Sequence, residues 1–320
     1  MKIYLGVDIG SVSTNIIAVD AEANVIFDRY IRTNGQPINS VKDGMRMLKE
    51  FTVDKAYEIM AVGVTGSGRQ LIGLMLGADV VKNEITAHSA ATVHFHPEVE
   101  TIFEIGGQDS KIIIVKNGIV TDFSMNTVCA AGTGSFLDHQ SERLGVMIED
   151  FGDLALTAKA SVRIAGRCTV FAESDMIAKQ QYGYSKAEII KGLCDALVRN
   201  YLNNLGRGKA LSAPFVFQGG VAANKGIIRA FEEQIEHEII IPKYFSVMGA
   251  IGAALLAKSN IEKTGSKTAF KGFDSVDLDF TPKSFECNGC SNVCEVVKVL
   301  IDGEPVAMWG DKCGKWSSSL

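Results

Sequence analysis

Hydrophobic positions recur with two different periods along the first 260 residues, and the chain switches between them repeatedly. Residues 38–51 carry apolar side chains at helical spacing, whereas shorter apolar runs bounded by Gly, Asn or Asp are typical of strands. We expect strands at 3–7, 15–20, 25–31, 56–65, 101–105, 111–116, 119–123, 214–218 and 238–241. We expect helices at 38–51, 70–76, 83–92, 185–205, 225–234 and 246–258. This alternation predicts an α/β protein.

One strand pattern occurs twice, about a hundred residues apart, which is the outline of an internal duplication. Three strands in residues 3–31 are interrupted by a turn at 8–14, and three strands in residues 101–123 are interrupted by a turn at 106–110. Two such halves facing each other would form a cleft with one phosphate-binding loop from each side. The sequence therefore predicts one half at residues 1–100 and a second at 101–258.

The interrupting turns contain residues that suit phosphate binding. A strand that ends in Asp8 and Gly10 and continues with small hydroxyl residues exposes backbone N–H groups to phosphate, while the Asp faces a divalent metal. The same residue types also make simple hairpin turns, so either turn alone supports both interpretations. A Gly-Gly pair at 219–220, between a strand and a helix, allows close approach to adenine or ribose.

Composition narrows the class of protein. The chain has 320 residues, 47% of them hydrophobic, and a net charge of −5, which argues against a nucleic-acid-coating surface. It has no apolar run near eighteen residues and no N-terminal pattern of a secretory signal, so we expect a cytoplasmic protein without a membrane span. His88, His94 and His96 lack regular spacing and a nearby carboxylate, which favours surface positions over a metal site.

Two of the seven cysteines, Cys129 and Cys168, each stand directly before an apolar, helix-forming run. Two thiolates are too few for a tetrahedral metal site in one chain, but they are the right number for half of a four-thiolate site across a two-fold axis. The helix N-termini would point positive dipole ends at such a site. We expect Thr133 and Ser135, or Thr169, to cap these helices. Cys194 lies on an apolar helix face, and we expect it in the core.

The remaining cysteines form a separate C-terminal group. Residues 259–283 are polar and mixed, which predicts a linker, and residues 284–320 form a Cys-rich extension. Cys287, Cys290 and Cys294 have C-x2-C-x3-C spacing, and Cys313 follows a predicted hairpin. This is a metal-ligand pattern, and its spacing leaves zinc and iron–sulfur open.

Five motifs together carry a resemblance to a known family. They are Asp8-Ile-Gly-Ser, Ile105-Gly-Gly-Gln-Asp109, Asn126-x-x-Cys129-Ala-Ala-Gly-Thr-Gly134, Cys168-Thr-Val-Phe-Ala-Glu-Ser174 and Gly219-Gly-Val-Ala-x-Asn224. Over about residues 1–258 the chain resembles the activator component of 2-hydroxyacyl-CoA dehydratases, of the BadF/BadG/BcrA/BcrD type, which includes reductases of double-cubane cluster proteins. The resemblance implies an actin-like ATPase fold of two RNase H-like halves and a homodimer. It also implies one [4Fe–4S] cluster held by Cys129 and Cys168 of both chains.

The resemblance also implies residue roles in a nucleotide cleft. Asp8 and Glu104 would position Mg²⁺ and the attacking water, with Gln108 and Asp109 as neighbours. The phosphates would be held by Gly10, Ser11, Val12, Ser13, Thr14, Asn15, Gly106 and Gly107, and the nucleoside by Gln218, Gly219, Gly220 and Asn224. Two residues depart from the family pattern: Glu104 replaces the usual Asp, and Asn15 replaces a common Lys. The cysteine extension lies beyond the shorter activators.

The function implied is an ATP-hydrolysing activator that passes low-potential electrons one at a time to a dehydratase or a double-cubane cluster protein. Its cofactors would be ATP/ADP, Mg²⁺ and the shared [4Fe–4S] cluster, and ferredoxin or flavodoxin would be the electron donor in an anaerobic cytoplasm. Two alternatives are a non-redox ATPase or kinase of the actin-like superfamily and a scaffold with a zinc-binding tail. The first gives no reason for Cys129 and Cys168 in their motifs, and the second would be favoured by chelator sensitivity without an iron chromophore.

Overall fold

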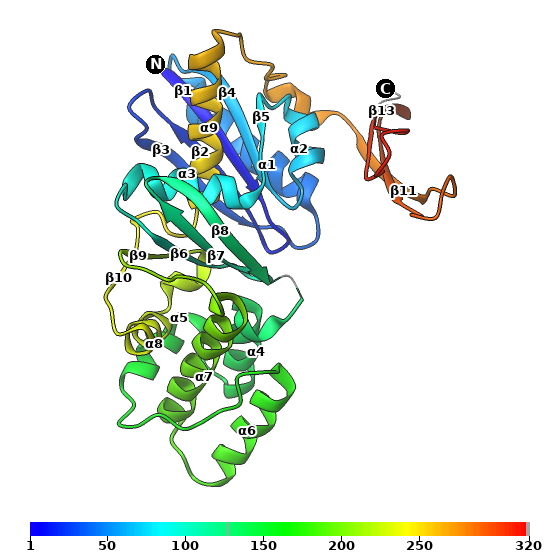
Figure 1. Ribbon diagram of the computed structural model, residues 1–320. Coiled ribbons are helices and arrows are strands. Elements are labelled where there is room, and N and C mark those ends of the chain that lie inside the picture. Colours follow the sequence, from blue (N-terminus) through cyan, green and yellow to red (C-terminus); the bar gives the residue numbers. More distant parts are fainter. Residues whose placement is uncertain (127, 318–320) are drawn as a thin grey trace. The chain divides into compact units, whose positions relative to one another are not determined.

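The computed structural model describes residues 1–126 and 128–317 and divides the chain into two compact units (Figure 1). Unit 1 consists of Met1–Gly10, Thr14–Asn83 and Ala253–Leu320, and unit 2 consists of Ser11–Ser13 and Glu84–Gly252. The predicted halves differ from these units, because the chain returns to unit 1 after residue 252. Thr127 of the first cysteine motif and residues 318–320 of the predicted extension lie outside the described residues.

Unit 1 is built on a five-stranded sheet in the order β3-β2-β1-β4-β5. These strands are β1 Lys2–Ile9, β2 Ser13–Val19, β3 Val25–Arg32, β4 Glu58–Gly66 and β5 Val80–Val81. Helices α1 (Pro37–Val53) and α2 (Arg69–Leu76) pack in one core with the odd-numbered β1 residues from Ile3 to Ile9. Helix α9 (Met248–Thr264) lies on the other face, where Lys258 stands over the Tyr4 ring. Strand alternation thus gives both faces of β1 an apolar cover.

Unit 2 repeats the same sheet plan in the order β10-β9-β6-β7-β8. The strands are β6 Thr101–Ile105, β7 Ser110–Lys116, β8 Ile119–Asn126, β9 Phe215–Gln218 and β10 Ile239–Ile240. In each unit the first strand pairs antiparallel with the second and parallel with the fourth, which confirms the predicted duplication. The larger core of unit 2 is aromatic, with Phe103 stacked on Phe231 at 5.0 Å. Each such buried ring contributes about 1.5–3 kcal/mol.

Most helices of unit 2 gather on one side of its sheet in Figure 1, and this group carries both cysteine segments. They are α4 Gly134–Leu144, α5 Ile148–Leu156, α6 Thr169–Gln181, α7 Lys186–Tyr201 and α8 Lys225–Ile235. Helix α3 (Glu84–Phe95) lies on the opposite face. Shorter turns are η1 Ala130–Gly132, η3 Gly220–Ala223 and the π-helical η2 Leu202–Gly206. The sequence pattern predicted the other helices but missed α5.

The C-terminal residues form a three-stranded antiparallel sheet of β11 (Phe280–Glu286), β12 (Glu295–Ile301) and β13 (Glu304–Trp309). The prediction of a linker at 259–283 is wrong for most of its length. Helix α9 continues to Thr264, and η4 (Phe273–Asp277) buries Val276 in the core of unit 1. Lys49 and Asp274 form an ion pair of 2.9 Å that holds η4 beside α1.

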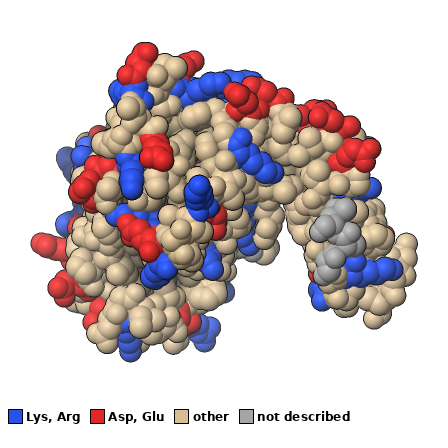
Figure 2. All heavy atoms as spheres, turned by 90° about the horizontal axis from the view of Figure 1, so that it is seen from above, with Lys and Arg blue, Asp and Glu red and all other residues tan. Residues whose placement is uncertain are grey.

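The charged residues on the face shown in Figure 2 are interspersed, in keeping with 32 basic and 37 acidic side chains in the whole chain. No helix within residues 1–126 and 128–317 is long and apolar enough to cross a membrane.

Candidate nucleotide site and cysteine loops

Asp8 lies at the end of β1 between two buried polar neighbours on the adjoining strands. Its register partners are Asn15 on β2 and Thr65 on β4, so the three side chains share one face of the sheet. Both Asn15 Oδ1 and Thr65 Oγ1 are buried and have no hydrogen-bond partner. Buried polar atoms are rarely left unpaired in folded proteins. Three oxygen-bearing side chains at adjoining strand ends therefore suit a ligand that supplies water, a metal ion or phosphate.

Thr14, which was predicted to contact phosphate, has a different environment. Its hydroxyl is fully buried and lies 3.1 Å from Thr33 Oγ1 and 2.8 Å from Ser40 Oγ. Thr33 in turn donates to the carbonyl of Gly10 at 3.0 Å. The Thr14 side chain therefore stabilises the turn from within, and its predicted part in nucleotide binding would fall to the backbone.

Glu104 occupies on β6 the position that Asp8 occupies on β1. Its register partners are Lys111 on β7 and Gln218 on β9. The buried Lys111 Nζ lies 2.8 Å from Glu104 Oε2 and 2.9 Å from Asp109 Oδ1. Both carboxylates raise the pKa of Lys111 above its ordinary value, so the amine stays charged. Glu104 was predicted to position metal and water; here one of its oxygens is committed to Lys111, which the sequence reasoning did not single out.

Gln218 and Asn224, which were predicted to hold the nucleoside, both make hydrogen bonds within the protein. Gln218 is fully buried, and its amide pairs with Thr92 Oγ1 at 2.8 Å and His88 Nδ1 at 3.0 Å. His88 is therefore a core residue, contrary to the surface position expected, and burial lowers its pKa to about 3. Asn224 caps α8 by accepting from the N–H of Ile227 at 3.1 Å, while its Nδ2 is buried without a partner.

Glycine is required at 219 for two reasons. Its φ is +91°, and an added Cβ would lie 2.3 Å from the carbonyl oxygen of Ile105 and 2.8 Å from Glu104 Oε1. Gly220 is exposed and has open space where a Cβ would be. The backbone between β9 and α8 is thus close to Glu104 on one side and accessible on the other. Gln108 is also exposed, in the turn after Gly107.

The predicted phosphate loop Gly106–Gly107 is hydrogen-bonded directly to the start of α4. Gly134 N–H donates to the carbonyl of Gly106 at 2.9 Å, and Ser135 N–H donates to that of Gly107 at 2.8 Å. The Ser135 hydroxyl also donates to Gly107 at 2.5 Å. The first N–H groups of a helix have no partner within the helix, and here the loop carbonyls satisfy two of them. The loop and the Cys129 segment therefore form one hydrogen-bonded unit.

Asn126 fixes the backbone around Cys129. Its Oδ1 accepts from the N–H of Cys129 at 2.9 Å, and its Nδ2 donates to the carbonyl of the same residue at 2.7 Å. Cys129 is a free, partly exposed thiol, followed by η1 and then by α4. Val128 beside it is 94% exposed, which is unusual for a large apolar side chain next to an ordered loop.

Cys168 is the N-cap residue of α6, and it is also a free, partly exposed thiol. Neither α4 nor α6 has the predicted side-chain cap. At the start of α4, Thr133 and Ser135 instead donate to the carbonyls of Ala130 and Gly107. Arg143 near the end of α4 forms an ion pair with Glu173 in α6. The two helices that follow the cysteines are therefore joined to each other.

Asn200 of α7 contacts both cysteine loops, and the sequence reasoning did not single it out. It is 4% exposed, and its amide donates to the carbonyl of Gly166, two residues before Cys168. A Cβ at Gly132, three residues after Cys129, would lie 3.0 Å from Asn200 Oδ1. The only sequence signal is an amide on the apolar face of a helix. One buried side chain thus sets the spacing of both loops.

Replacing Asn200 with Ala should therefore destabilise unit 2 by about 1–3 kcal/mol, the cost of leaving buried polar groups unpaired. Urea unfolding followed by circular dichroism measures the change. The matched control is Asn204→Ala, which removes an exposed amide that donates to Asn200 at 3.1 Å and should cost less than about 0.5 kcal/mol. Equal effects of both substitutions would contradict the role assigned to Asn200.

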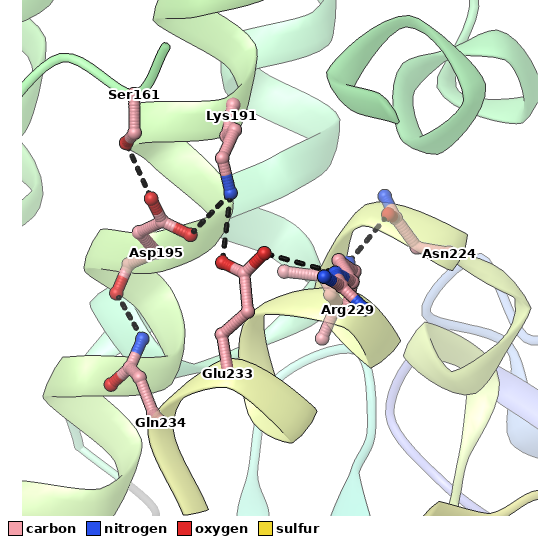
Figure 3. A network of polar contacts seen from close by, with 8 residues as sticks. Ser161, Lys191, Asp195, Asn224, Arg229, Glu233 and Gln234 are labelled. Carbon is pink, nitrogen blue, oxygen red and sulfur yellow. Dashed lines mark hydrogen bonds and ion pairs between the residues drawn. The ribbon is translucent and has the colours of Figure 1, made fainter. Parts of the chain in front are cut away.

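A polar network joins α7 to α8 (Figure 3). Lys191 of α7 lies 2.9 Å from Glu233 of α8, which also accepts from Arg229 at 2.9 Å. Gln234 Nε2 donates to the backbone carbonyl of Asp195 at 3.1 Å. Partly exposed ion pairs of this kind contribute about 0–1 kcal/mol each, so the network matters more for orientation than for stability. It fixes α8, which follows the glycine pair and the short turn η3, against the helix that carries Asn200.

A cavity of 1170 Å³ opens beside the Cys168 loop. Five cationic side chains and one carboxylate line it: Arg163, Arg167, Lys179, Arg199, Arg207 and Asp175. Asp175 Oδ2 already accepts from the N–H of Ala165 at 2.8 Å. The cavity is therefore locally positive in a chain whose net charge is negative.

Comparison with known proteins places these motifs in one family. The sequence profile of the BadF/BadG/BcrA/BcrD ATPase family matches residues 5–257. The chain belongs to this family. One relative of this chain is the (R)-2-hydroxyglutaryl-CoA dehydratase activating ATPase of Acidaminococcus fermentans. It is 35% identical over 271 residues, covering 82% of this chain and 100% of the relative.

Solved structures agree with the assignment to the BadF/BadG/BcrA/BcrD ATPase family. The activator of the 2-hydroxyisocaproyl-CoA dehydratase from Clostridium difficile with bound ADPNP has a TM-score of 0.74 and 30% identity, covering 82% of this chain and 97% of that one. A ROK family glucokinase from Streptomyces griseus, 13% identical with a TM-score of 0.50, shares the fold alone. The fold is thus the actin-like ATPase fold, as predicted. The family match ends before the cysteine tail.

Proposed function

We propose that this chain is an ATP-hydrolysing electron-transfer activator. It would deliver low-potential electrons one at a time to an acyl-CoA dehydratase or a double-cubane cluster protein. The family and the named dehydratase activators among its relatives support the ATPase and activator parts of this proposal. The electron-transfer part rests on the arrangement of this chain's own residues.

The observation that carries the proposal is the direct hydrogen bonding between Gly106–Gly107 and the start of α4. If these glycines hold nucleotide phosphates, any movement of their loop changes the position of Gly134 and Ser135. Cys129 lies five residues before Gly134 on the same segment. A plain kinase of this fold has no need for a cysteine loop attached in this way.

A second connection leads from the proposed nucleoside loop to both cysteines. Gly219 and Gly220 precede α8, the polar network of Figure 3 fixes α8 on α7, and Asn200 of α7 contacts both loops. Both connections, one through α4 and one through α8 and α7, therefore end at the cysteine loops. Such a chain of discrete contacts is what coupling between two sites requires, and it is tested by perturbing each link.

The residues present fit the two inorganic cofactors. The unpartnered Asn15 Oδ1 and Thr65 Oγ1 beside Asp8 fit a hydrated Mg²⁺ ion with nucleotide phosphates. The free thiols of Cys129 and Cys168, each before a helix start, fit two ligands of a [4Fe–4S] cluster whose other two ligands come from a second copy. When bound, the cluster would carry one electron at a time, and Mg²⁺ would neutralise phosphate charge.

Exposed apolar side chains support a homodimer around the cysteines. Val128 lies next to Cys129, and Val170 and Phe171, which are 63% and 64% exposed, follow Cys168 closely. Large apolar residues gathered at two partly exposed thiols suit a surface covered by another chain. The positive cavity beside Cys168 suits the acidic surface of an electron donor or acceptor, such as ferredoxin or flavodoxin.

In the proposed cycle, the chain's residues convert a nucleotide change into a change of loop position. The N–H groups of residues 10–15 and of Gly106 and Gly107 would bind phosphate, and Asp8 would help to hold Mg²⁺, which would neutralise phosphate charge. Glu104, held by Lys111 and with Gln108 and Asp109 as neighbours, keeps the second loop in place. ATP can favour one loop position only by binding it more tightly than the other. Hydrolysis then removes that preference, which makes the cycle directional.

The test is to purify the chain without oxygen and to measure iron, acid-labile sulfide and the EPR spectrum after reduction with dithionite. We expect roughly four iron atoms per dimer and one spin system, and electron transfer to an acceptor dehydratase that requires ATP. A protein that hydrolyses ATP but contains no iron, and cannot be reconstituted with iron and sulfide, would establish the alternative of a non-redox ATPase.

A further inference from the structure

The four cysteines outside the family match converge at one end of the C-terminal sheet. Cys287 follows β11 directly, and Cys294 precedes β12 directly. Because β12 runs antiparallel to both neighbours, its start lies beside the ends of β11 and β13. Cys290 lies in the turn between β11 and β12, and Cys313 comes four residues after the end of β13. The topology therefore brings all four cysteines to the same end of the sheet.

Hydrogen bonds show this convergence in detail. The N–H of Cys287 donates to the carbonyl of Cys294 at 2.8 Å. The indole N–H of Trp316 donates to Cys287 Sγ at 3.2 Å, so the chain that carries Cys313 folds back onto the first cysteine. Asp311 accepts from the N–H groups of Trp316 and Ser317 at 2.9 and 3.2 Å, which shapes the turn that contains Cys313.

Backbone groups of the C-x2-C turn lie close around the Cys287 sulfur. The backbone N–H of Gly289 forms a hydrogen bond with Cys287 Sγ. An added Cβ at Gly289 would lie 3.4 Å from Cys287 Sγ, which shows how closely the C-x2-C turn wraps this sulfur.

We propose that Cys287, Cys290, Cys294 and Cys313 bind a single zinc ion as a tetrathiolate site. Four thiols with C-x2-C spacing suit structural zinc. Around one zinc ion the sulfurs lie roughly 3.8 Å apart, since each Zn–S bond is about 2.3 Å, and this suits thiols carried by directly paired strand ends. No three His, Cys, Asp or Glu side chains within the described parts of the chain are spaced to hold a metal. Zinc would therefore draw the exposed Cys290 and Cys313 inward.

The tail has a physical need for such a cross-link. Within its sheet only Phe280, Val296 and Val299 are buried apolar side chains. Phe280 and Val299 pack into the core of unit 1, while Val297 and Trp309, which are nearer the cysteines, are only partly buried against it. Small sheets with few buried residues are stabilised by metals or disulfides. A zinc ion would cross-link the cysteine end of the sheet, and this role does not depend on the redox function.

The experiment measures zinc and iron in the full-length protein purified without oxygen, beside the variants Cys290→Ser and Cys313→Ser. We expect roughly one zinc per chain in the unchanged protein, and loss of at least about nine-tenths of it in each variant, with iron and ATP hydrolysis unchanged. The matched control is Ser291→Ala, an exposed change in the same turn that keeps every thiol. It should retain zinc fully.

A second readout follows the tail alone, because both tryptophans of the chain, Trp309 and Trp316, lie in it. Removing zinc with a zinc chelator should change tryptophan fluorescence in the unchanged protein and leave it unchanged in Cys290→Ser. Zinc that persists in both cysteine variants would be adventitious and would overturn the proposal. Absence of metal would overturn it too, as would roughly twelve iron atoms per dimer that fall to four in the variants.

Discussion

Replacing Cys129 with Ser should produce a colourless dimer with less than about a tenth of the iron of the unchanged protein. In a site shared across a two-fold axis, each substitution removes two of the four thiolates, because both copies carry it. Cys168→Ser should have the same effect for the same reason. Iron analysis and EPR after anaerobic reconstitution measure the loss, and ATP-driven electron transfer should fall to background.

The control for these variants is Cys194→Ala. Burial raises the pKa of the Cys194 thiol, so it remains protonated in the core, where its sulfur lies 3.1 Å from the position of a Cβ on Gly226. Its loss should cost about 1 kcal/mol of stability and leave the iron content unchanged. If Cys129→Ser or Cys168→Ser retained a normal iron content and EPR signal, the shared site would be refuted.

Asp8→Asn should reduce ATP hydrolysis by about 100-fold or more while the iron content stays normal. The substitution removes a negative charge between Asn15 and Thr65, where a hydrated Mg²⁺ ion would be positioned. Charge stabilisation by a catalytic metal is worth several kcal/mol, and each 1.36 kcal/mol corresponds to a tenfold change in rate. Steady-state hydrolysis and electron transfer are measured on the same preparation, and both should fall together.

Asp28→Asn is the matched control, since it makes the same chemical change on the exposed side of β3 in the same unit. It should leave hydrolysis and transfer unchanged. Electron transfer that continues at the normal rate in Asp8→Asn would remove the nucleotide site from the mechanism, whatever happens to the cysteine variants.

The fold could be predicted largely from the sequence, because its elements depend on local patterns. The turn after Asp8 and the turn after Ile105 recur in equivalent places, and the sheets that contain them have the same strand order. The prediction of a linker at residues 259–283 was wrong, and the reason is physical. Residues 265–277 are mostly polar, but Val276 and a few neighbours pack on unit 1, and tertiary contacts of this kind leave no periodic pattern.

The candidate site could be predicted only in part. Motif residues such as Asp8 and Cys129 stand out as residue types in a spacing, whereas the roles of Lys111, Thr65 and Asn200 appear only once strand register and tertiary contacts are known. Lys111 is a lysine in an apolar strand, and only the register with Glu104 shows that it is paired and buried. The predicted cap by Ser135 was wrong, and its hydroxyl instead donates to Gly107, a residue 28 positions earlier.

The hydrogen bonds between Gly106–Gly107 and Gly134–Ser135 are mostly made by peptide groups. An alanine scan, which truncates side chains one at a time, would leave these backbone hydrogen bonds intact. It would therefore not detect the coupling that they provide. Homologous chains can likewise diverge at every side chain here and keep the link, provided that the glycines remain. Amide hydrogen exchange at Gly134 and Ser135, measured with and without ATP, would report on these hydrogen bonds directly.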